Sequence, residues 1–183
     1  MSARPTVSSG KSWKSNSTEK VMTRIGYASG AFDLFHIGHL NILKNAKGRC
    51  DFLIAGVVSD EMLRIHKGVT PVIPLAERLE IVRNVRCVDE AVEAQVNDKL
   101  AIWRDLHFDV FFKGDDWRGT EKGDRLEREF AEVGVDVVYF PYTGSTSSTA
   151  LRKALANIDR IAARSFVGSG RPGTAAGACG LAA

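Results

Sequence analysis

Short apolar runs alternate along the chain with longer segments in which apolar residues recur every three or four positions. The short runs predict five strands, at 23–29, 52–58, 88–92, 109–113 and 135–140. The longer segments predict helices at 38–47, 75–84, 98–106, 125–133 and from 148 to about 163. In the last helix we expect an inward face made of Leu151, Leu155, Ile158 and Ile161. Repeated strand–helix order predicts a three-layer α/β fold with a parallel central sheet.

The two ends of the chain lack this pattern. We expect residues 1–22 to be a disordered polar leader, residues 23–164 to form the domain, and residues 165–183 to be a disordered Gly/Ala-rich tail. The 183 residues, with 44% hydrophobic and 26% charged side chains, suit one globular domain. No apolar run approaches the roughly 20 residues that span a bilayer, so no membrane span is expected.

Charge and cysteine usage narrow the partners and the compartment. The net charge is +3, but residues 1–24 and 150–183 each hold five basic side chains against one acidic one, which leaves an acidic body. Such a body lacks the cationic face that duplex binding needs, so no nucleic-acid partner is expected. Three scattered cysteines favour neither a disulfide framework nor a zinc site, and because the first residues lack an apolar run we expect no secretory signal. We therefore expect a cytoplasmic protein.

The segment after the first predicted strand, GAFDLFHIGH at 30–39, carries two histidines where a helix begins. His36 and His39 are three residues apart, so both imidazoles lie on one side of the first turn. Gly38 lets a ligand approach the backbone, and the N–H groups of a helix start favour an anion. A capping histidine beside a surface histidine is the structural alternative, and a zinc site lacks a third ligand at suitable spacing. The whole string in this context predicts a phosphate site.

Three further segments add candidate ligands. Lys67, Arg78 and Arg86 are each more often surface charges when taken alone, but together they suit a triphosphate. KGDDW at 113–117 places adjacent acids after a buried strand, and YTGSTSST at 142–149 brings hydroxyls to a helix start. Helix capping is the structural alternative for both. Because the carboxyl ends of parallel strands meet at one edge of the sheet, we expect these segments to share a site.

Residues 25–155 resemble the glycerol-3-phosphate cytidylyltransferases of the HxGH nucleotidyltransferase superfamily. The resemblance lies in the histidine string, the order Lys67, Glu77-Arg78 and RCVDE, the GDDW motif and the hydroxyl segment. It implies a Rossmann-like nucleotidyltransferase fold, a homodimer, and direct in-line transfer of CMP from CTP to glycerol 3-phosphate. The products would be CDP-glycerol and pyrophosphate. It implies no metal held by protein ligands, with Mg²⁺ bound mainly through the CTP phosphates.

The resemblance also implies roles for individual residues. The catalytic groups would be His36, His39 and Lys67. The nucleotide would be bound by Ala31, Phe32, Gly38, Arg78, Arg86, Thr143, Ser145, Thr146, Ser147, Ser148 and Thr149. The phosphorylated acceptor would be bound by His66, Lys99, Asp116 and Trp117.

Three departures from the family pattern keep alternatives open. Ala31 stands where the family usually has Thr, and Tyr142 and Gly144-Ser145 stand where it has Arg and Glu-Gly. The segment after Lys67 (GVTPVIP) is longer and more apolar. The alternatives are another acceptor of the choline, ethanolamine or heptose phosphate type, an adenylyl donor, or an inactive nucleotide-binding module.

Overall fold

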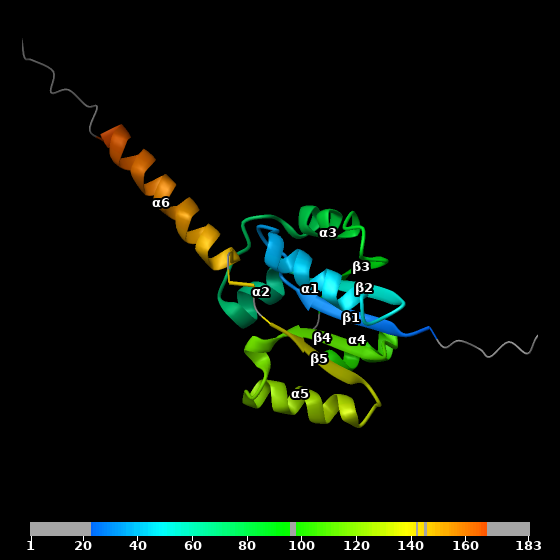
Figure 1. Ribbon diagram of the computed structural model, residues 1–183. Coiled ribbons are helices and arrows are strands. Elements are labelled where there is room, and N and C mark those ends of the chain that lie inside the picture. The colour runs from blue at the N-terminus through cyan, green and yellow to red at the C-terminus, as the bar shows by residue number, and fades with distance from the viewer. Residues whose placement is uncertain (1–22, 96–97, 142, 145, 168–183) are drawn as a thin grey trace, which may run out of the picture.

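A single parallel sheet forms the centre of the molecule (Figure 1). The computed structural model describes residues 23–95, 98–141, 143–144 and 146–167. Its strands are ordered β3-β2-β1-β4-β5, and every neighbouring pair is parallel. They span β1 (Ile25–Gly30), β2 (Phe52–Val58), β3 (Glu90–Ala94), β4 (Val110–Gly114) and β5 (Asp136–Phe140). The predicted α/β architecture with a parallel central sheet is confirmed.

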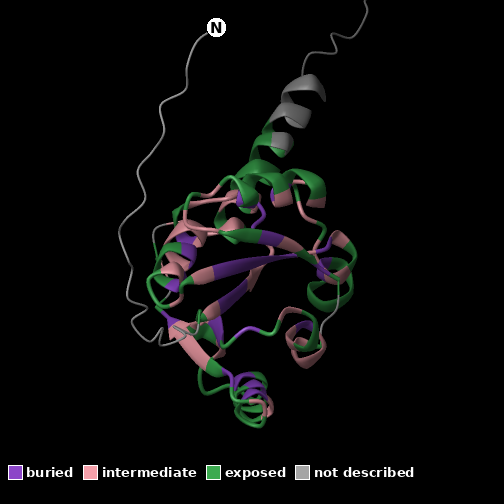
Figure 2. Cartoon of the chain, turned by 90° about the vertical axis from the view of Figure 1, so that its right-hand side faces the viewer, coloured by how far each residue is buried: buried purple, intermediate pink, exposed green. Residues whose placement is uncertain are grey.

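Helices cover both faces of the sheet (Figure 1). One face carries α1 (Ile37–Lys47) and α3 (Leu75–Arg83), and the other carries α4 (Lys99–Leu106) and α5 (Glu121–Ala131). Each face has its own core, with Leu43, Val82 and Phe112 in the first and Phe111 and Phe130 in the second. Figure 2 shows the buried strands between these helical layers. The alternation of side chains along each strand therefore fills two separate cores.

The strand order indicates at which end of the sheet a ligand would bind. The chain builds β1, β2 and β3 outward and then crosses back to β4 on the other side of β1. This reversal makes a topological switch point between β1 and β4, where ligands bind at the carboxyl ends of strands. The loop after β1 and the short 3₁₀ helix η1 (Asp115–Trp117) after β4 leave the sheet at this edge.

Several predicted boundaries differ from the structure. The helix α2 (Asp60–Lys67) was not predicted, and α5 begins four residues before the predicted start at 125. Both additions are short polar segments whose only buried residues are Leu63 in α2 and Gly123 in the first turns of α5. Apolar periodicity does not reveal these segments, because a single buried position does not form an apolar stripe.

The last helix is the largest correction. Helix α6 (Ser148–Val167) runs four residues past the predicted end and extends away from the sheet (Figure 1). Leu155, Ile158 and Ile161 are 41%, 61% and 66% exposed, so the predicted inward face is wrong beyond Leu151. The leader at 1–22 and residues 168–183 of the predicted tail lie outside the described residues. In the part of the chain that is described, no helix has the length and hydropathy to cross a bilayer.

Candidate active site

Two imidazoles meet at the start of α1. His36 caps the helix, and its Nδ1 accepts a hydrogen bond of 3.0 Å from the backbone N–H of Gly38. The ring centroids of His36 and His39 are 4.0 Å apart, with 30° between the ring planes. A side chain at position 38 would force the ring of His36 to move, because a Cβ there would lie 2.7 Å from Cε1 of His36. The predicted convergence of the two rings is therefore present.

Both imidazoles are neutral near pH 7. Burial lowers the pKa of His36. For His39, burial first and then the neighbouring His36 lower the pKa to about 4, against the opposing charge of Asp33. Because Nδ1 of His36 accepts a hydrogen bond, its neutral ring carries the proton on Nε2. Nδ1 of His39 is buried with no partner among the described residues. The pair thus offers uncharged hydrogen-bonding groups at a helix start.

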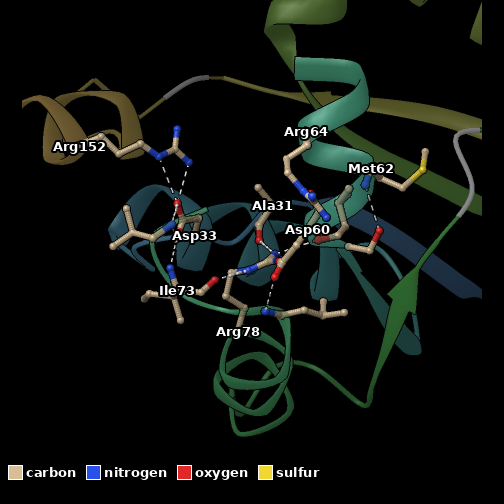
Figure 3. Close-up of polar contacts among 12 residues, drawn as sticks. Ala31, Asp33, Asp60, Met62, Arg64, Ile73, Arg78 and Arg152 are labelled. Atoms are coloured by element: carbon tan, nitrogen blue, oxygen red, sulfur yellow. Dashed lines mark hydrogen bonds and ion pairs between the residues drawn. The ribbon is translucent and has the colours of Figure 1, made fainter. Parts of the chain in front are cut away.

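Asp33, which we did not predict as a site residue, fixes the loop that carries this pair (Figure 3). Its buried carboxylate accepts hydrogen bonds from the backbone N–H of Val72 at 3.1 Å and of Ile73 at 2.9 Å, and pairs with Arg152 at 2.8 Å. Burial opposes ionisation, but these hydrogen bonds hold the pKa of Asp33 below its ordinary value. Asp33 therefore ties together the loop after β1, the α2–α3 connection and α6.

Arg78 has a different place from the one predicted. We expected a mobile cation that contacts the triphosphate, but the side chain is fully buried. Its guanidinium donates to the carbonyls of Ala31, Val58 and Ile73 and pairs with Asp60, as Figure 3 shows. With these donors engaged, Arg78 is a positioning residue that holds the backbone of the β1 loop.

The backbone of the β1 loop is strained where the nucleotide was predicted to bind. Phe32 and Leu34 have φ values of 50° and 49°, in the left-handed region that side-chain-bearing residues rarely adopt. Such conformations persist only where the surroundings hold them. Arg78 binds the carbonyl of Ala31, and Ser148 Oγ donates to the carbonyl of Asp33 at 2.8 Å. The side chain of Phe32 is buried, so this residue presents its backbone and not its ring to the edge.

The hydroxyl segment reaches the same helix start. Thr143 Oγ1 accepts a hydrogen bond of 3.3 Å from Asn41 in α1, and its Cβ would be 3.7 Å from a Cβ on Gly38. Ser147 Oγ accepts from the N–H of Ala150 at 3.1 Å, and therefore caps α6. Thr146 is half-buried and Thr149 is exposed. Ser145 and Tyr142 lie outside the described residues. Thr143 and Ser148 are thus the members of this segment that the structure ties to the β1 and α1 loop.

A cluster of lysines lies on the other side of the switch point. Lys67 ends α2, and His66 beside it is exposed. Lys99 begins α4, and Asp116 and Trp117 lie in η1. Lys113, the penultimate residue of β4, places Nζ 4.4 Å from the ring centroid of Trp117. Three of the predicted acceptor residues, Lys99, Asp116 and Trp117, therefore lie near a lysine that was not predicted.

Arg86 is not brought to this edge. It lies in the connection between α3 and β3, and Asp89 in the same connection accepts from the N–H of Leu53 at 2.6 Å. Leu53 is at the start of β2, so this connection is at the amino ends of the strands. Within one chain, Arg86 therefore lies at the opposite edge from the imidazole pair, and its predicted contact with the nucleotide is corrected.

The residues present do not form a metal cage. No group of three or more His, Cys, Asp or Glu side chains that could hold a metal ion occurs among the described residues. Asp33, the acid whose charge reaches His39, is already occupied by Arg152 and two backbone N–H groups.

Weak signals in the sequence pointed to the residues that were missed. Lys113 follows three apolar residues at the end of a strand, where a charge is out of place. Ser59, the acids at 60 and 61, and Gly68 are the capping signals of the unpredicted α2. Asp33 and Arg152 are 119 residues apart, and no local pattern relates them.

Comparison with known proteins agrees with this geometry. A family model described as Cytidylyltransferase-like matches residues 27–154. The chain is 34% identical over 130 residues to the glycerol-3-phosphate cytidylyltransferase of Bacillus spizizenii, covering 70% of this chain and 95% of that protein. It is 36% identical over 126 residues to the bifunctional protein HldE of Streptomyces coelicolor, covering 68% of this chain but only 27% of that protein.

The fold also recurs among solved structures. The lipopolysaccharide core biosynthesis protein of Thermoplasma volcanium matches with a TM-score of 0.58 and 24% sequence identity, covering 67% of this chain and 98% of that chain. At this identity the likeness shows the fold alone. With the family match, it confirms the predicted Rossmann-like nucleotidyltransferase fold.

Proposed function

The chain belongs to the cytidylyltransferase-like family of nucleotidyltransferases, and from this premise we propose that it transfers CMP from CTP to glycerol 3-phosphate. The products are CDP-glycerol and pyrophosphate. The observation that carries the proposal is the imidazole pair, with centroids 4.0 Å apart at the start of α1. Uncharged imidazoles and a helix start together form a site for phosphate oxygens.

The proposed nucleotide site lies between the β1 loop and the hydroxyl segment. The triphosphate lies at the start of α1, within reach of His36, His39 and Thr143. The backbone of Ala31 and Phe32, held by Arg78 and Asp33, forms its wall. Lys67, at the exposed end of α2, approaches the phosphates from the acceptor side. This arrangement leaves the α-phosphorus between the imidazoles and the lysines.

The proposed reaction is a direct in-line displacement. An oxygen of the acceptor phosphate attacks the α-phosphorus of CTP, and the bond from that phosphorus to the bridging oxygen of the β-phosphate breaks. The electron pair leaves with pyrophosphate, and no covalent enzyme intermediate forms. Hydrogen bonds from the imidazoles and the charge of Lys67 stabilise the oxygens that gain charge in the transition state.

We propose that Mg²⁺ enters with the substrate as the Mg–CTP complex. The donor set supports this proposal, because Asp33 is occupied and Mg²⁺ prefers oxygen ligands to imidazole nitrogen. The protein's own part is to bind the phosphates of that complex and to orient them. The proposed active species is a homodimer, which light scattering after size-exclusion chromatography tests.

Glycerol 3-phosphate is favoured over choline phosphate by one contact. A trimethylammonium group is recognised on aromatic faces, but the ring of Trp117 already has the ammonium of Lys113 4.4 Å from its centroid. The match over 95% of a glycerol-3-phosphate cytidylyltransferase supports the same choice. Ethanolamine phosphate, a heptose phosphate with an adenylyl donor, and an inactive nucleotide-binding module are the competing assignments.

Pyrophosphate release tests the proposal. The purified full chain is assayed with CTP or ATP and Mg²⁺, against glycerol 3-phosphate, choline phosphate, ethanolamine phosphate and a heptose 1-phosphate. We expect the highest kcat/KM for CTP with glycerol 3-phosphate, with CDP-glycerol identified by ³¹P NMR. A higher value for another pair reassigns the substrate. Binding of CTP without turnover on any acceptor makes the chain a binding module.

A further inference from the structure

Three lysines from separate elements converge at the carboxyl end of β4. They are Lys67 at the end of α2, Lys99 at the start of α4 and Lys113 near the end of β4. Burial lowers the pKa of Lys113 to about 8, and the charges of Lys67 and Lys99 add to this effect. Burial and then Lys67 likewise lower the pKa of Lys99, against the opposing charge of Asp98. The three ammonium groups are thus within electrostatic reach of one another.

The charge of this cluster exceeds that of the acids that act on it, which are Asp116 on Lys113 and Asp98 on Lys99. No ion pair or hydrogen bond joins the ammonium of Lys67, Lys99 or Lys113 to any described residue. Asp116 is the acid whose charge acts on Lys113, and the contact that Lys113 makes is with the ring of Trp117. Lys99 and Lys113 are half-buried and Lys67 is exposed, and cations that repel one another at a partly buried site cost free energy unless an anion joins them. The cluster is therefore built for an anionic ligand.

We propose that Lys113 binds the phosphate of the acceptor as a dianion, together with Lys67 and Lys99, and so sets the preference for a phosphomonoester. This inference rests on the proposed function and adds to it a residue for which the family resemblance gives no role. A phosphomonoester dianion offers two charges to three cations, whereas a monoanionic diester offers one. The site therefore selects a terminal phosphate over an esterified one.

The same geometry couples binding to a proton. Around Lys113 the groups that carry or change charge are Lys67 from α2, Lys99 from α4 and Asp116 from η1, while Asp98 acts on Lys99. Near pH 8 a fraction of the Lys113 side chains is uncharged. A dianion beside the amine favours the ammonium form, so binding takes up a proton from solution.

Steady-state kinetics of Lys113→Met test the role of the ammonium group. Methionine keeps most of the apolar stem of the side chain and removes the ammonium group that lies over the ring of Trp117. We expect KM for glycerol 3-phosphate to rise at least tenfold, while KM for CTP and kcat at saturating acceptor change less than twofold. Lys113→Arg, which keeps the charge, should recover most of the affinity. Lys122→Met on the exposed face of α5 is the matched control. An unchanged KM for the acceptor overturns the proposal.

Calorimetry separates failure of this inference from failure of the proposed function. Inorganic phosphate is titrated into the full chain at pH 8 in two buffers that differ in ionisation enthalpy. We expect proton uptake on binding in the unchanged chain and in Lys122→Met, and its loss in Lys113→Met. Proton uptake without turnover on glycerol 3-phosphate would support the phosphate site at the lysines and contradict glycerol 3-phosphate as the acceptor. Turnover with no dependence of phosphate binding on Lys113 keeps the function and rejects the site.

Discussion

The two sides of the switch point between β1 and β4 differ in whether their charged side chains form ion pairs. On the β1 side, the buried charges of Asp33 and Arg78 are matched by Arg152, Asp60 and backbone groups. On the β4 side, three lysines lie within electrostatic reach of one another, and none forms an ion pair with a described residue. On the β1 side the paired charges fix the backbone of the loop, whereas on the β4 side the three lysines outnumber the acids that act on them.

This difference separates residues that fix geometry from residues that meet a ligand. Matched buried charges hold the strained Phe32 and Leu34 in place, so the imidazoles stay at the start of α1. The lysines on the β4 side form no ion pair that fixes the backbone, so their counter-charge would come from a bound anionic ligand. Changes on the β1 side should therefore alter kcat or stability, and changes of Lys99 or Lys113 on the β4 side should alter acceptor affinity.

The largest effect is expected from His39→Ala. We expect kcat and kcat/KM to fall together by about 10²–10³-fold, the cost typical of removing one donor to a developing oxyanion. KM for CTP should stay within a few-fold, because the lost interaction strengthens in the transition state. Pyrophosphate release under saturating conditions measures the effect.

A second histidine supplies the control for that experiment. His107 is exposed at the end of α4 with φ at 49°, a conformation that Asn tolerates. His107→Asn should keep full activity. Normal turnover by a correctly folded His39→Ala protein would remove His39 from the catalytic groups.

The next largest effect is expected from Arg78→Met on the β1 side. The change leaves three backbone carbonyls and Asp60 without their buried donor. We expect a loss of about 3 kcal/mol in the free energy of unfolding, in the range for breaking a buried ion pair. Urea denaturation followed by circular dichroism measures it.

The same helix provides a matched comparison for Arg78. Arg83 in α3 is exposed, and its nearest acid, Glu80, is 3.9 Å away. Arg83→Met should change the free energy of unfolding by less than about 0.5 kcal/mol. Equal stabilities of the two variants would show that Arg78 does not hold the loop.

Apolar periodicity was enough to predict the architecture of this chain. Buried runs such as 52–58 identify parallel strands covered on both faces, and their alternation with helical segments gives the layers. The prediction of an inward face on α6 failed, because the spacing of apolar residues identifies an apolar face but not the element that packs against it. Leu155 and Ile158 have the expected spacing and are still exposed.

The site was predictable where a motif is local. His36, Gly38 and His39 occupy one helical turn, so their convergence follows from the sequence alone. Arg78 and Arg86 were grouped by their order along the chain, but α3 runs from one edge of the sheet to the other and separates them. Asp33 and Arg152 meet through tertiary structure, which spacing does not encode.

The smallest expected effect uses pH to tell the two sides apart. With its pKa lowered to about 4, His39 stays neutral in the folded chain where the unfolded chain takes up a proton. The free energy of unfolding should therefore rise with pH between about 4 and 6.5, by on the order of 1–3 kcal/mol from this residue. Lys113, with its pKa lowered to about 8, likewise makes the free energy of unfolding rise with pH, between about 8 and 10.5.

Urea denaturation measured across pH tests this separation. His39→Gln should remove the rise in the free energy of unfolding only in the acidic range, and Lys113→Met should remove it only in the alkaline range. A variant that removes the rise in both ranges, or in neither, would contradict the separation of the two sides.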